Sequence, residues 1–393
     1  MRRFLEVQGI SKVQGREGAK VRAMHCSAWV ALVALVVLLS SCGGGHQAST
    51  HDEGDTLHLK YAKNLTIVRH DGYTEVCLKD PWNQGKTLHR YVLVPPGGDG
   101  KGATIVHVPL QRAVVGTSVL CGLIDRLGRR DIIGGVCDVQ YVNIPFVQEG
   151  CRKGTIADCG SGLAPTLEKI IDLEPDAICL SPFQNSGGYG RIEELDVPII
   201  EMADYMETSA LGRAEWVKFY GMLFGAEQEA DSLFQVVEAD YLRLKELAKT
   251  AKTQPSVLMD KQTGSVWYVP AGNGTVGRII QDANIRYAWA DTQESGSLPL
   301  PFETILEKAG GADIWLFRYN APKPITYSAL LSENNGYSQF KAFRQRSSYG
   351  CNTATTTFYE ETPFHPNLLL RDFITIAHPE LGLGEPRYFL PVK

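Results

Sequence analysis

The sequence lacks the charge excess and the long apolar segments that mark two large classes of protein. Lys and Arg number 39 and Asp and Glu number 44, so the formal net charge is -5 over 393 residues. No basic stripe is present, and the electrostatic footprint of a nucleic-acid-binding protein is therefore missing. The apolar run at 28–39 contains twelve residues, which is short for a membrane span. The length and the 44% hydrophobic content instead favour about two or three globular domains.

Common catalytic signatures are also absent. The motifs HExxH, GxSxG and Walker A do not occur, and "CGSG" at 159–162 has neither a preceding strand nor a placed base. The nine histidines do not cluster as metal ligands, and His365 and His378, each followed by Pro, suit the ends of local structure. We therefore expect a protein that is not an enzyme and that holds no cofactor or metal site of its own.

The N-terminal segment has the pattern of a lipoprotein signal peptide. Basic residues are scattered over 2–22, and the run at 28–39 has the length of a signal-peptide h-region. Leu39-Ser40-Ser41-Cys42 resembles a bacterial lipobox, which implies cleavage before Cys42 and lipid attachment to it. We expect a signal peptide over 1–41, a flexible spacer over 42–56, and a lipid-anchored protein on the periplasmic side of the cell envelope. An uncleaved anchor helix and a start at Met24 are the alternatives.

Cysteine pairs with CxxC spacing are missing, so no zinc knuckle is expected. Two of the nine cysteines lie in the signal peptide and at the lipid site; the odd number left cannot all pair within one chain. Export permits disulfides, and both Cys151–Cys159 and Cys137–Cys159 are possible. Alternatively, most are small buried hydrophobic residues, as we expect for Cys179 in an apolar strand. The seven are Cys77, Cys121, Cys137, Cys151, Cys159, Cys179 and Cys351.

A mixed α/β organisation follows the spacer. Residues 57–98 contain strand-like runs separated by Asp-Gly, Asp-Pro and Asn-Gln-Gly turns, which predicts antiparallel lead-in strands. Residues 99–225 alternate strands and helices, which favours a mainly parallel sheet flanked by helices. The expected strands are 103–108, 131–136, 176–181 and 197–202, with helices at 116–128 and from Pro165 onward.

A long helix separates this N-terminal lobe from a second lobe. Residues 210–225 are expected to form one helix that ends or bends at Gly225, and 226–250 another, roughly 37 Å long. We assign 226–252 as an interlobe helix. Residues 253–393 repeat the α/β rhythm, with strands at 256–260 and 265–269, a helix at 274–283, and a helix followed by a strand over 301–317.

One local pattern occurs in both lobes. In "PTLEKIIDLEPDAICL" a Pro opens a helix, Glu168 lies near the helix start off its apolar face, and a buried strand follows. "PFETILEKAGGADIWLF" repeats this order, with Glu303 at the matching place. A helix N-terminus by itself stabilises such a carboxylate by about 0.3–1 kcal/mol, so the pattern needs no partner.

From 103 to about 381 the chain resembles the substrate-binding proteins of ABC importers for ferric siderophores, haem and cobalamin. The matching segments include "TIVHV", "IIGGV", the interlobe helix and the two Glu-bearing segments. "GRAEWVKFYG", "SVWYVPAGNGTVGRIIQDA" and "LLLRDFITIAHPEL" are similar to a branch found as lipoproteins in gut-type anaerobes. In this family one Glu per lobe contacts Arg residues of the permease. The resemblance therefore implies that Glu168 and Glu303 dock on an ABC permease in the inner membrane.

The family's fold implies a ligand cleft between the lobes, at the carboxyl ends of the strands. Aromatic and cationic side chains there suit a bulky or anionic chelate. Each has an ordinary alternative: Trp267 and Tyr268 could pack inside the lobe, and the arginines could be solvated or salt-bridged. The residues expected to bind the ligand are Arg112, Tyr141, Phe183, Trp267, Tyr268, Arg318 and Tyr319.

Two functions stay open at this point. The first is a substrate-binding subunit that captures an iron-siderophore-type chelate or cobalamin and delivers it to the permease. The second is a lipoprotein of the same fold that captures haem or a chelate without docking on a permease. Delivery depends on Glu168 and Glu303, whereas capture does not.

Overall fold

A computed structural model describes residues 54–98, 100, 104–184 and 188–393 of the chain. The chain divides into two units, Met1–His51 and Asp52–Lys393, and everything below concerns the second. The predicted signal peptide and Cys42 lie outside the described residues. Within the described ranges, no helix has both the length and the apolar content needed to cross a bilayer.

The predicted lead-in strands form a five-stranded sheet with the order β1-β2-β3-β4-β5. The first four strands are antiparallel, whereas β5 runs parallel to β4. Two predictions are corrected here. Residues 55 and 56, expected in the spacer, form β1, and the strand expected to open the N-terminal lobe is β5 of this sheet. The strands are β1 (Asp55–Thr56), β2 (Leu65–His70), β3 (Tyr73–Lys79), β4 (Thr87–Val94) and β5 (Thr104–His107).

The burial of β5 explains its place at a sheet edge. Only Val106 of its four residues is buried. A strand inside a helix-covered parallel sheet is buried on both faces, as all four residues of β11 (Ala177–Leu180) are. Sequence pattern alone did not separate these two kinds of strand, because "TIVH" and "AICL" are both short and apolar.

The N-terminal lobe has a five-stranded, fully parallel sheet with the order β12-β11-β6-β7-β8. Alternate residues point to opposite faces: Val115 and Cys179 join the main core, whereas Val114 and Ile178 join a smaller cluster on the other face. The remaining elements are β6 (Ala113–Val115), β7 (Ile133–Val136), β8 (Ala157–Asp158), the hairpin β9 (Gly160–Ser161) and β10 (Ala164–Pro165), β12 (Ile199–Glu201), α2 (Ser118–Arg126), α3 (Pro145–Lys153) and α4 (Leu167–Leu173).

Three helices lead from this lobe to the next. The helix predicted over 210–225 is divided into α5 (Ala210–Glu215) and α6 (Val217–Phe224) at the buried Trp216. Gly225 ends α6 with a φ of 62°, a conformation that suits glycine. The predicted interlobe helix is confirmed as α7 (Glu227–Ala248), whose 22 residues span about 33 Å.

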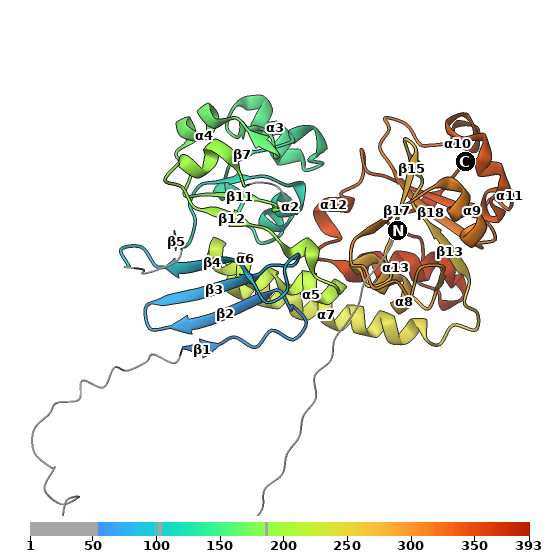
Figure 1. Cartoon of the computed structure of the whole chain (residues 1–393), viewed down its shortest axis with the longest axis horizontal. Helices are drawn as coiled ribbons and strands as arrows, with labels where there is room; N and C mark the ends of the chain where they lie inside the picture. The colour runs from blue at the N-terminus through green and yellow to red at the C-terminus, as the bar shows by residue number, and fades with distance from the viewer. Residues whose placement is uncertain (1–53, 99, 101–103, 185–187) are drawn as a thin grey trace, which may run out of the picture. The chain divides into compact units, whose positions relative to one another are not determined.

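Both ends of α7 are anchored, each to a different part of the molecule (Figure 1). Near its start, Glu227 pairs with Arg69 of β2 at 2.7 Å. Toward its end, the Tyr241 hydroxyl donates to Asp282 of the C-terminal lobe at 2.7 Å. The helix therefore bridges the N-terminal sheet and the C-terminal lobe.

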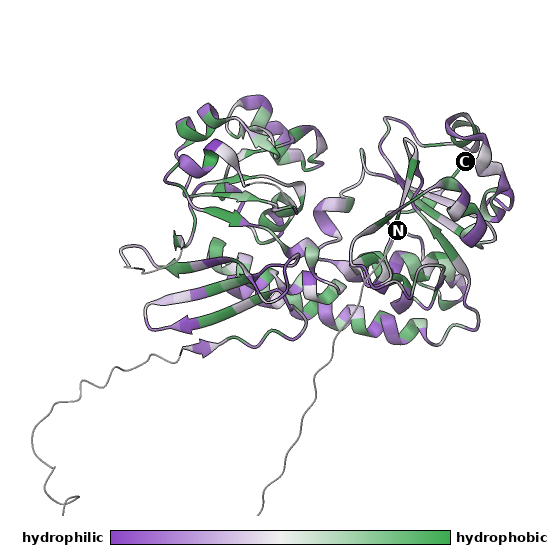
Figure 2. Cartoon of the chain, in the orientation of Figure 1, coloured by the Kyte–Doolittle hydropathy of each residue, from purple (hydrophilic) through white to green (hydrophobic). Residues whose placement is uncertain are grey.

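The C-terminal lobe contains a five-stranded sheet, β16-β13-β18-β19-β20, in which only the β19–β20 pair is antiparallel. The central strands of both lobes are mostly hydrophobic (Figure 2). This confirms the predicted class of two α/β lobes. The elements are β13 (Ser256–Met259), β16 (Arg286–Tyr287), β18 (Ile314–Tyr319), β19 (Ser348–Asn352), β20 (Leu390–Pro391), α8 (Thr275–Asp282), α9 (Phe302–Ala309), α10 (Tyr327–Glu333), α11 (Lys341–Arg344), α12 (Phe358–Glu361) and α13 (Pro366–Ala377).

One predicted strand of this lobe lies in a different sheet. The strand predicted over 265–269 is β15 (Val266–Pro270), which pairs antiparallel with β14 (Gln262–Thr263) and β17 (Ser297–Leu300). A tight turn at Gly264, with a φ of 61°, connects β14 to β15. Antiparallel strands can be joined by so short a turn, whereas parallel strands need a long crossover.

Candidate functional site

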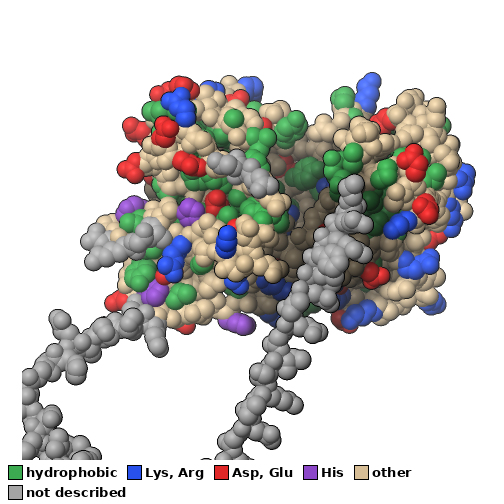
Figure 3. All heavy atoms as spheres, viewed as in Figure 1, with side chains coloured by type: hydrophobic (Ala, Val, Ile, Leu, Met, Phe, Trp, Pro, Cys, Tyr) green, Lys and Arg blue, Asp and Glu red, His purple; other side chains and the backbone are tan. Residues whose placement is uncertain are grey.

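The carboxyl ends of the two parallel sheets face each other. Asn143, just beyond β7, donates from its side chain to the carbonyls of Thr353 at 2.6 Å and Thr356 at 3.1 Å, just beyond β19. Its backbone N–H donates to Glu360 at 2.8 Å. Figure 1 shows α12 between the lobes, and Figure 3 shows the surface hollowed there, with hydrophobic side chains on both walls.

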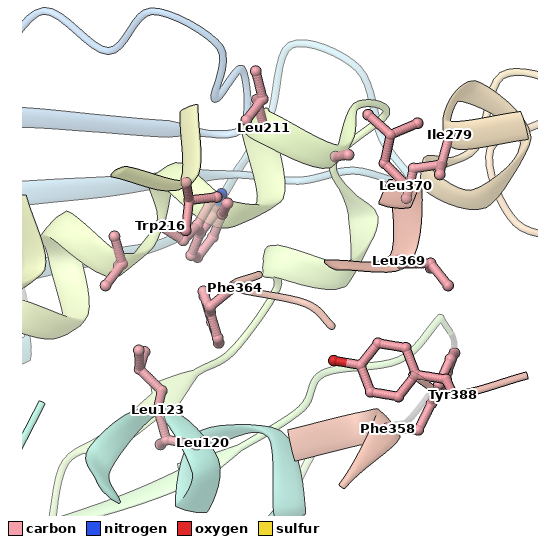
Figure 4. Packing of buried hydrophobic residues seen from close by; sticks show 14 of the residues in the cluster. Leu120, Leu123, Leu211, Trp216, Ile279, Phe358, Phe364, Leu369, Leu370 and Tyr388 are labelled. Atoms are coloured by element: carbon pink, nitrogen blue, oxygen red, sulfur yellow. The ribbon is translucent and has the colours of Figure 1, made fainter. Parts of the chain in front are cut away.

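Residues 353–365, here called the interlobe segment, pack closely against the N-terminal lobe. A Cβ added at Gly122 of α2 would lie 2.3 Å from the Glu360 carbonyl oxygen, so only glycine permits this approach. Phe364 points into the space between Trp216 and Leu123 (Figure 4). Burial and the nearby Arg126 charge lower the pKa of His365 to about 4; at neutral pH its ring is therefore uncharged and accepts the 3.2 Å bond from Arg126.

A cavity of about 130 Å³ lies between the lobes, beside the interlobe segment. Val119 and Arg213 reach it from the N-terminal lobe, and the rest of its lining comes from the C-terminal lobe. That lining is mostly apolar and includes Met259, Asp260, Thr275, Val276, Ile279, Arg318, Phe358, Tyr359, Thr362, Pro363, Leu369, Phe373 and Phe389.

Arg213 is held in the cavity wall by a buried carboxylate. Its Nε donates to Asp204 at 2.9 Å, and Asp204 is only 2% exposed. The other Asp204 oxygen accepts from the Tyr220 hydroxyl at 2.8 Å; burial and this carboxylate raise the pKa of Tyr220 well above its usual value. Among the residues that the structure describes, the terminal nitrogens of Arg213 have no hydrogen-bond partner.

Arg318 is fixed in the same way from the other lobe. Its Nε and Nη2 donate to the two oxygens of Asp260 at 2.9 and 2.7 Å. Burial would lower the pKa of Arg318, but the charge and hydrogen bonds of Asp260 outweigh it, so the pKa is raised. Its Nη1 has no partner within the described part of the chain. The cavity thus offers N–H donors from two fixed guanidinium groups, which suit a carboxylate or another oxyanion.

Of the seven predicted ligand residues, only Arg318 lines this cavity. Tyr141 and Phe183 are 61% and 46% exposed and follow β7 and β11 at the carboxyl edge of the N-terminal sheet. Tyr268 is 47% exposed on β15. Tyr319 lines a separate cavity of about 250 Å³ beside the C-terminal residues 390–393.

Trp267 was expected to form a wall of the cleft, and this prediction is wrong. The side chain is fully buried, and its indole N–H donates to the Met259 carbonyl at 2.9 Å. Its ring packs against Trp315, Tyr337 and Phe340, with centroids 5.5 to 5.9 Å apart. Because strand neighbours point to opposite faces, Tyr268 is exposed while Trp267 belongs to the core.

The structure also contradicts the placement of Arg112. Arg112 precedes β6 and therefore lies at the amino edge of the sheet, away from the cleft. Its backbone N–H donates to Asp176 at 2.8 Å and its guanidinium to the Leu173 carbonyl at 3.1 Å. The sequence predicts the first strand of the lobe over 103–108, whereas that strand is β6, which has only three residues.

Glu168 and Glu303 occupy matching positions. Each is the second residue of its helix, α4 or α9, and each helix follows a short antiparallel strand after one intervening residue. Both side chains are exposed, and neither has an ion pair or side-chain hydrogen bond among the described residues. Pro165 lies in β10 and not in the helix as expected, because Thr166 is the capping residue.

Arg213 and Tyr359 were not singled out from the sequence. Arg213 occurs in "GRAEW", which carried only a family resemblance, and Tyr359 in a segment with no strong periodicity. The sequence feature that comes nearest to identifying Arg213 as a site residue is its position in the first helix after the last strand of the lobe.

A family model described as periplasmic binding protein matches residues 139–354. Two proteins of Methanocaldococcus jannaschii are similar over most of the chain. The uncharacterized lipoprotein MJ0878 is 26% identical over 360 residues, 84% of each chain. The uncharacterized lipoprotein MJ0872 is 24% identical over 372 residues, which cover 88% of this chain and 92% of the relative.

Solved structures share the fold. A periplasmic binding protein from Veillonella parvula has a TM-score of 0.58 at 12% identity, covering 78% of this chain and 98% of that one. A periplasmic heme binding protein from Pseudomonas aeruginosa has a TM-score of 0.57 at 16% identity, covering 72% and 98%. The molybdate periplasmic binding protein MolA from Haemophilus influenzae has a TM-score of 0.57 at 14% identity, covering 70% and 88%.

Proposed function

The chain belongs to the periplasmic binding protein family, as the resemblance predicted, and from this premise we propose that it captures a metal chelate between its lobes and delivers it to an ABC permease. One observation carries the capture step. Arg213 and Arg318, from different lobes, both line the interlobe cavity, and each is held by its own aspartate with N–H donors to spare. A ligand group that accepts from both would join the lobes.

The size of the cavity restricts what enters it. Sites for drug-sized ligands occupy about 300–1,000 Å³, whereas this cavity has about 130 Å³. We therefore assign to it one anionic or oxygen-rich group of the chelate. The body of the ligand would lie in the hollow between the lobes, against exposed aromatic side chains such as Tyr141, Phe183 and Tyr359. Ferric siderophore, haem and cobalamin are the candidate classes; the names of two structural neighbours mention heme and Fe3+-hydroxamate, whereas cobalamin is implied by the family resemblance alone.

The geometry also supports the delivery step. A helix between two parallel strands runs antiparallel to them, so the starts of α4 and α9 lie at the carboxyl edges of their sheets. Glu168 and Glu303 are therefore at corresponding corners, exposed and without partners in the described part of the chain. Basic residues of a permease at both corners would seat the two lobes together.

Anchoring by lipid at Cys42 completes the proposal. Two relatives of the chain are named lipoproteins, and the lipobox-like sequence precedes Cys42. Cys42→Ala should release the protein from the membrane to the soluble fraction of fractionated cells. Retention in the membrane would support an uncleaved anchor helix instead.

Calorimetry with haem, cyanocobalamin, a ferric hydroxamate and a ferric catecholate tests the capture step. We expect an anionic probe to bind, and we expect Arg213→Gln and Arg318→Gln to weaken its affinity at least about tenfold, since a hydrogen bond to a charged group contributes about 1.5–3 kcal/mol.

Two further variants serve for comparison. Arg318→Lys keeps the positive charge but loses the planar guanidinium group that can donate two parallel hydrogen bonds. Arg112→Gln, at the opposite edge of the sheet, is the matched control. Equal affinity in all four variants would place the ligand elsewhere.

A further inference from the structure

The N-terminal sheet places two cysteines side by side on one face. The register of the parallel strands β7 and β8 pairs Val136 with Asp158. Beyond this pair, Cys159 N donates to Val136 O at 2.8 Å and Asp138 N donates to Gly160 O at 2.7 Å, so the two segments stay adjacent although the register shifts by one residue. Cys137 and Cys159 each follow the last paired residue of their strand and therefore lie next to each other, near the spacing of neighbouring strands, about 4.8 Å.

Both side chains point into the same small cluster. Cys137 and Cys159 are 1% and 0% exposed and share the cluster that contains Ile170 of α4. Cys151 packs instead against the main core, on the other face of the sheet. Of the two disulfides that the sequence allowed, only Cys137–Cys159 joins thiols on one face.

We propose that Cys137 and Cys159 form a disulfide when the chain folds in an oxidising compartment. Neighbouring strands bring Cα atoms within the 4.4–6.8 Å that a disulfide requires. The oxidant is a protein or small-molecule disulfide. The thiolate of one cysteine attacks it to form a mixed disulfide, and the other cysteine then displaces the leaving thiolate. Two electrons pass to the oxidant, whose two sulfur atoms leave as thiols that carry both protons.

The disulfide forms before the N-terminal lobe has finished folding. Burial raises the pKa of the Cys137 thiol to about 12 and that of Cys159 to about 11, so the folded pair holds almost no thiolate and is shielded from reagents. Oxidation therefore belongs to the exported, incompletely folded chain. Once formed, the buried bond is equally protected from reductants.

The disulfide would fix two functional segments to one another. Cys137 leads into Asp138 and the exposed Tyr141, and Asp138 accepts from Gly162 N at 2.9 Å. The Cys159 carbonyl accepts from the N–H of Thr166, the capping residue of α4, at 2.8 Å. The bond thus joins the loop that carries Tyr141 to the segment that positions Glu168. This inference does not depend on the identity of the ligand.

Peptide mapping of the full chain tests the pairing directly. The protein, exported to an oxidising compartment, is alkylated under denaturing, non-reducing conditions and digested with trypsin. We expect a cross-link between peptides 131–152 and 154–169, which disappears on reduction. Because 131–152 contains both Cys137 and Cys151, Cys151→Ser resolves the assignment: the cross-link persists there and is lost in Cys137→Ser. Alkylation of all seven thiols, or a cross-link that Cys151→Ser removes, would overturn the proposal.

Thermal unfolding gives a second readout on the same protein. A disulfide that closes a loop of 22 residues should raise the melting temperature by roughly 4–5 °C. Reduction in denaturant, followed by refolding in reductant, should remove this gain in the wild type and in Cys151→Ser, and should leave the melting temperature of the Cys137→Ala/Cys159→Ala variant unchanged. If the melting temperature of the wild type is the same with and without reduction in denaturant, the proposed disulfide does not form.

Discussion

The two lobes contain the same arrangement of strand, Glu-bearing helix and strand, but the buried residues that pack behind this helix differ between them. In each, a short antiparallel strand, one capping residue, a helix with Glu at its second position and a buried strand follow in order. Behind α4 the cluster is aliphatic and contains two cysteines, together with Val114, Ile178 and Leu180. Behind α9 the core is aromatic and contains Trp267, Trp315, Phe317, Tyr337 and Phe340.

This difference shows which features packing determines and which it does not. A protein interior must be filled without large voids. Cysteine and aliphatic side chains can fill it in one lobe, and aromatic rings can fill it in the other. The exposed glutamates have no packing role, yet both lobes present one at the same helix position. A carboxylate at a helix start is stabilised by the dipole, but aspartate or serine would serve equally well. The match between Glu168 and Glu303 is therefore the feature that the permease-docking proposal explains best.

Reversing both charges should have the largest effect of any change. Like charges brought together at an interface cost several kcal/mol, so Glu168→Arg plus Glu303→Arg should abolish uptake of the chelate into cells. Each single variant should transport partially, since the other lobe still docks. Ligand affinity and unfolding should be unchanged, because exposed charges contribute little to folding.

Asp172→Arg supplies the control, since Asp172 lies on the exposed side of α4, away from the helix start. Normal uptake by the double variant would remove the docking role and leave a lipoprotein that captures its ligand without a permease. Loss of uptake by Asp172→Arg as well would indicate a general charge effect and not docking at the corner.

Truncating the aromatic core should destabilise the protein more than truncating the thiol-containing core. Trp267→Ala should cost about 3–5 kcal/mol in the free energy of unfolding, because it leaves a cavity among large rings. Ile178→Val, in the fully buried cluster behind α4, removes a single methyl group and should cost about 0.5–1.5 kcal/mol. Urea unfolding measures both. A stable Trp267→Ala variant with lost ligand affinity would restore Trp267 as a wall of the cleft.

Much of this architecture was accessible from the sequence. The order of strands and helices, the long interlobe helix and the matching glutamates depend on periodicity over ten or more residues, where the pattern is strong. The sheet to which a strand belongs was less accessible. The strands β5 and β15 were recognised as strands, but hydrogen-bond partners far along the chain decide their sheets.

The candidate site was harder to predict for a related reason. Arg318 was found because it lies on a long, clearly recognisable strand, whereas Arg112 was misplaced because β6 is too short to show a pattern. Trp267 and Tyr268 are adjacent, and a shift of one residue in register exchanges core and surface. Arg213 reaches the cavity from a helix in the other lobe, a contact that no local pattern contains.

The exposed aromatic side chains should matter for affinity and little for stability. Tyr141→Ala and Phe183→Ala, at the carboxyl edge of the N-terminal sheet, should weaken chelate binding by about 2 kcal/mol, roughly thirtyfold. Tyr268→Ala tests the exposed aromatic side chain on β15 of the C-terminal lobe. Calorimetry on folded variants measures the effect. Unchanged affinity in all three would mean that the ligand contacts only the inner cavity.

The smallest effect concerns the motion of one lobe against the other. The lobes are joined by α7, and the interlobe segment adds the bonds from Asn143 to Thr353, Thr356 and Glu360. A helix resists the dihedral changes that a flexible hinge absorbs. X-ray scattering with and without the bound chelate should therefore show little change in the radius of gyration. Asn143→Ala removes two side-chain hydrogen bonds, about 1 kcal/mol each, and should make the scattering slightly more sensitive to ligand while the backbone bond to Glu360 persists. A large closure of the wild-type protein on binding would show that neither α7 nor the interlobe segment restrains the lobes.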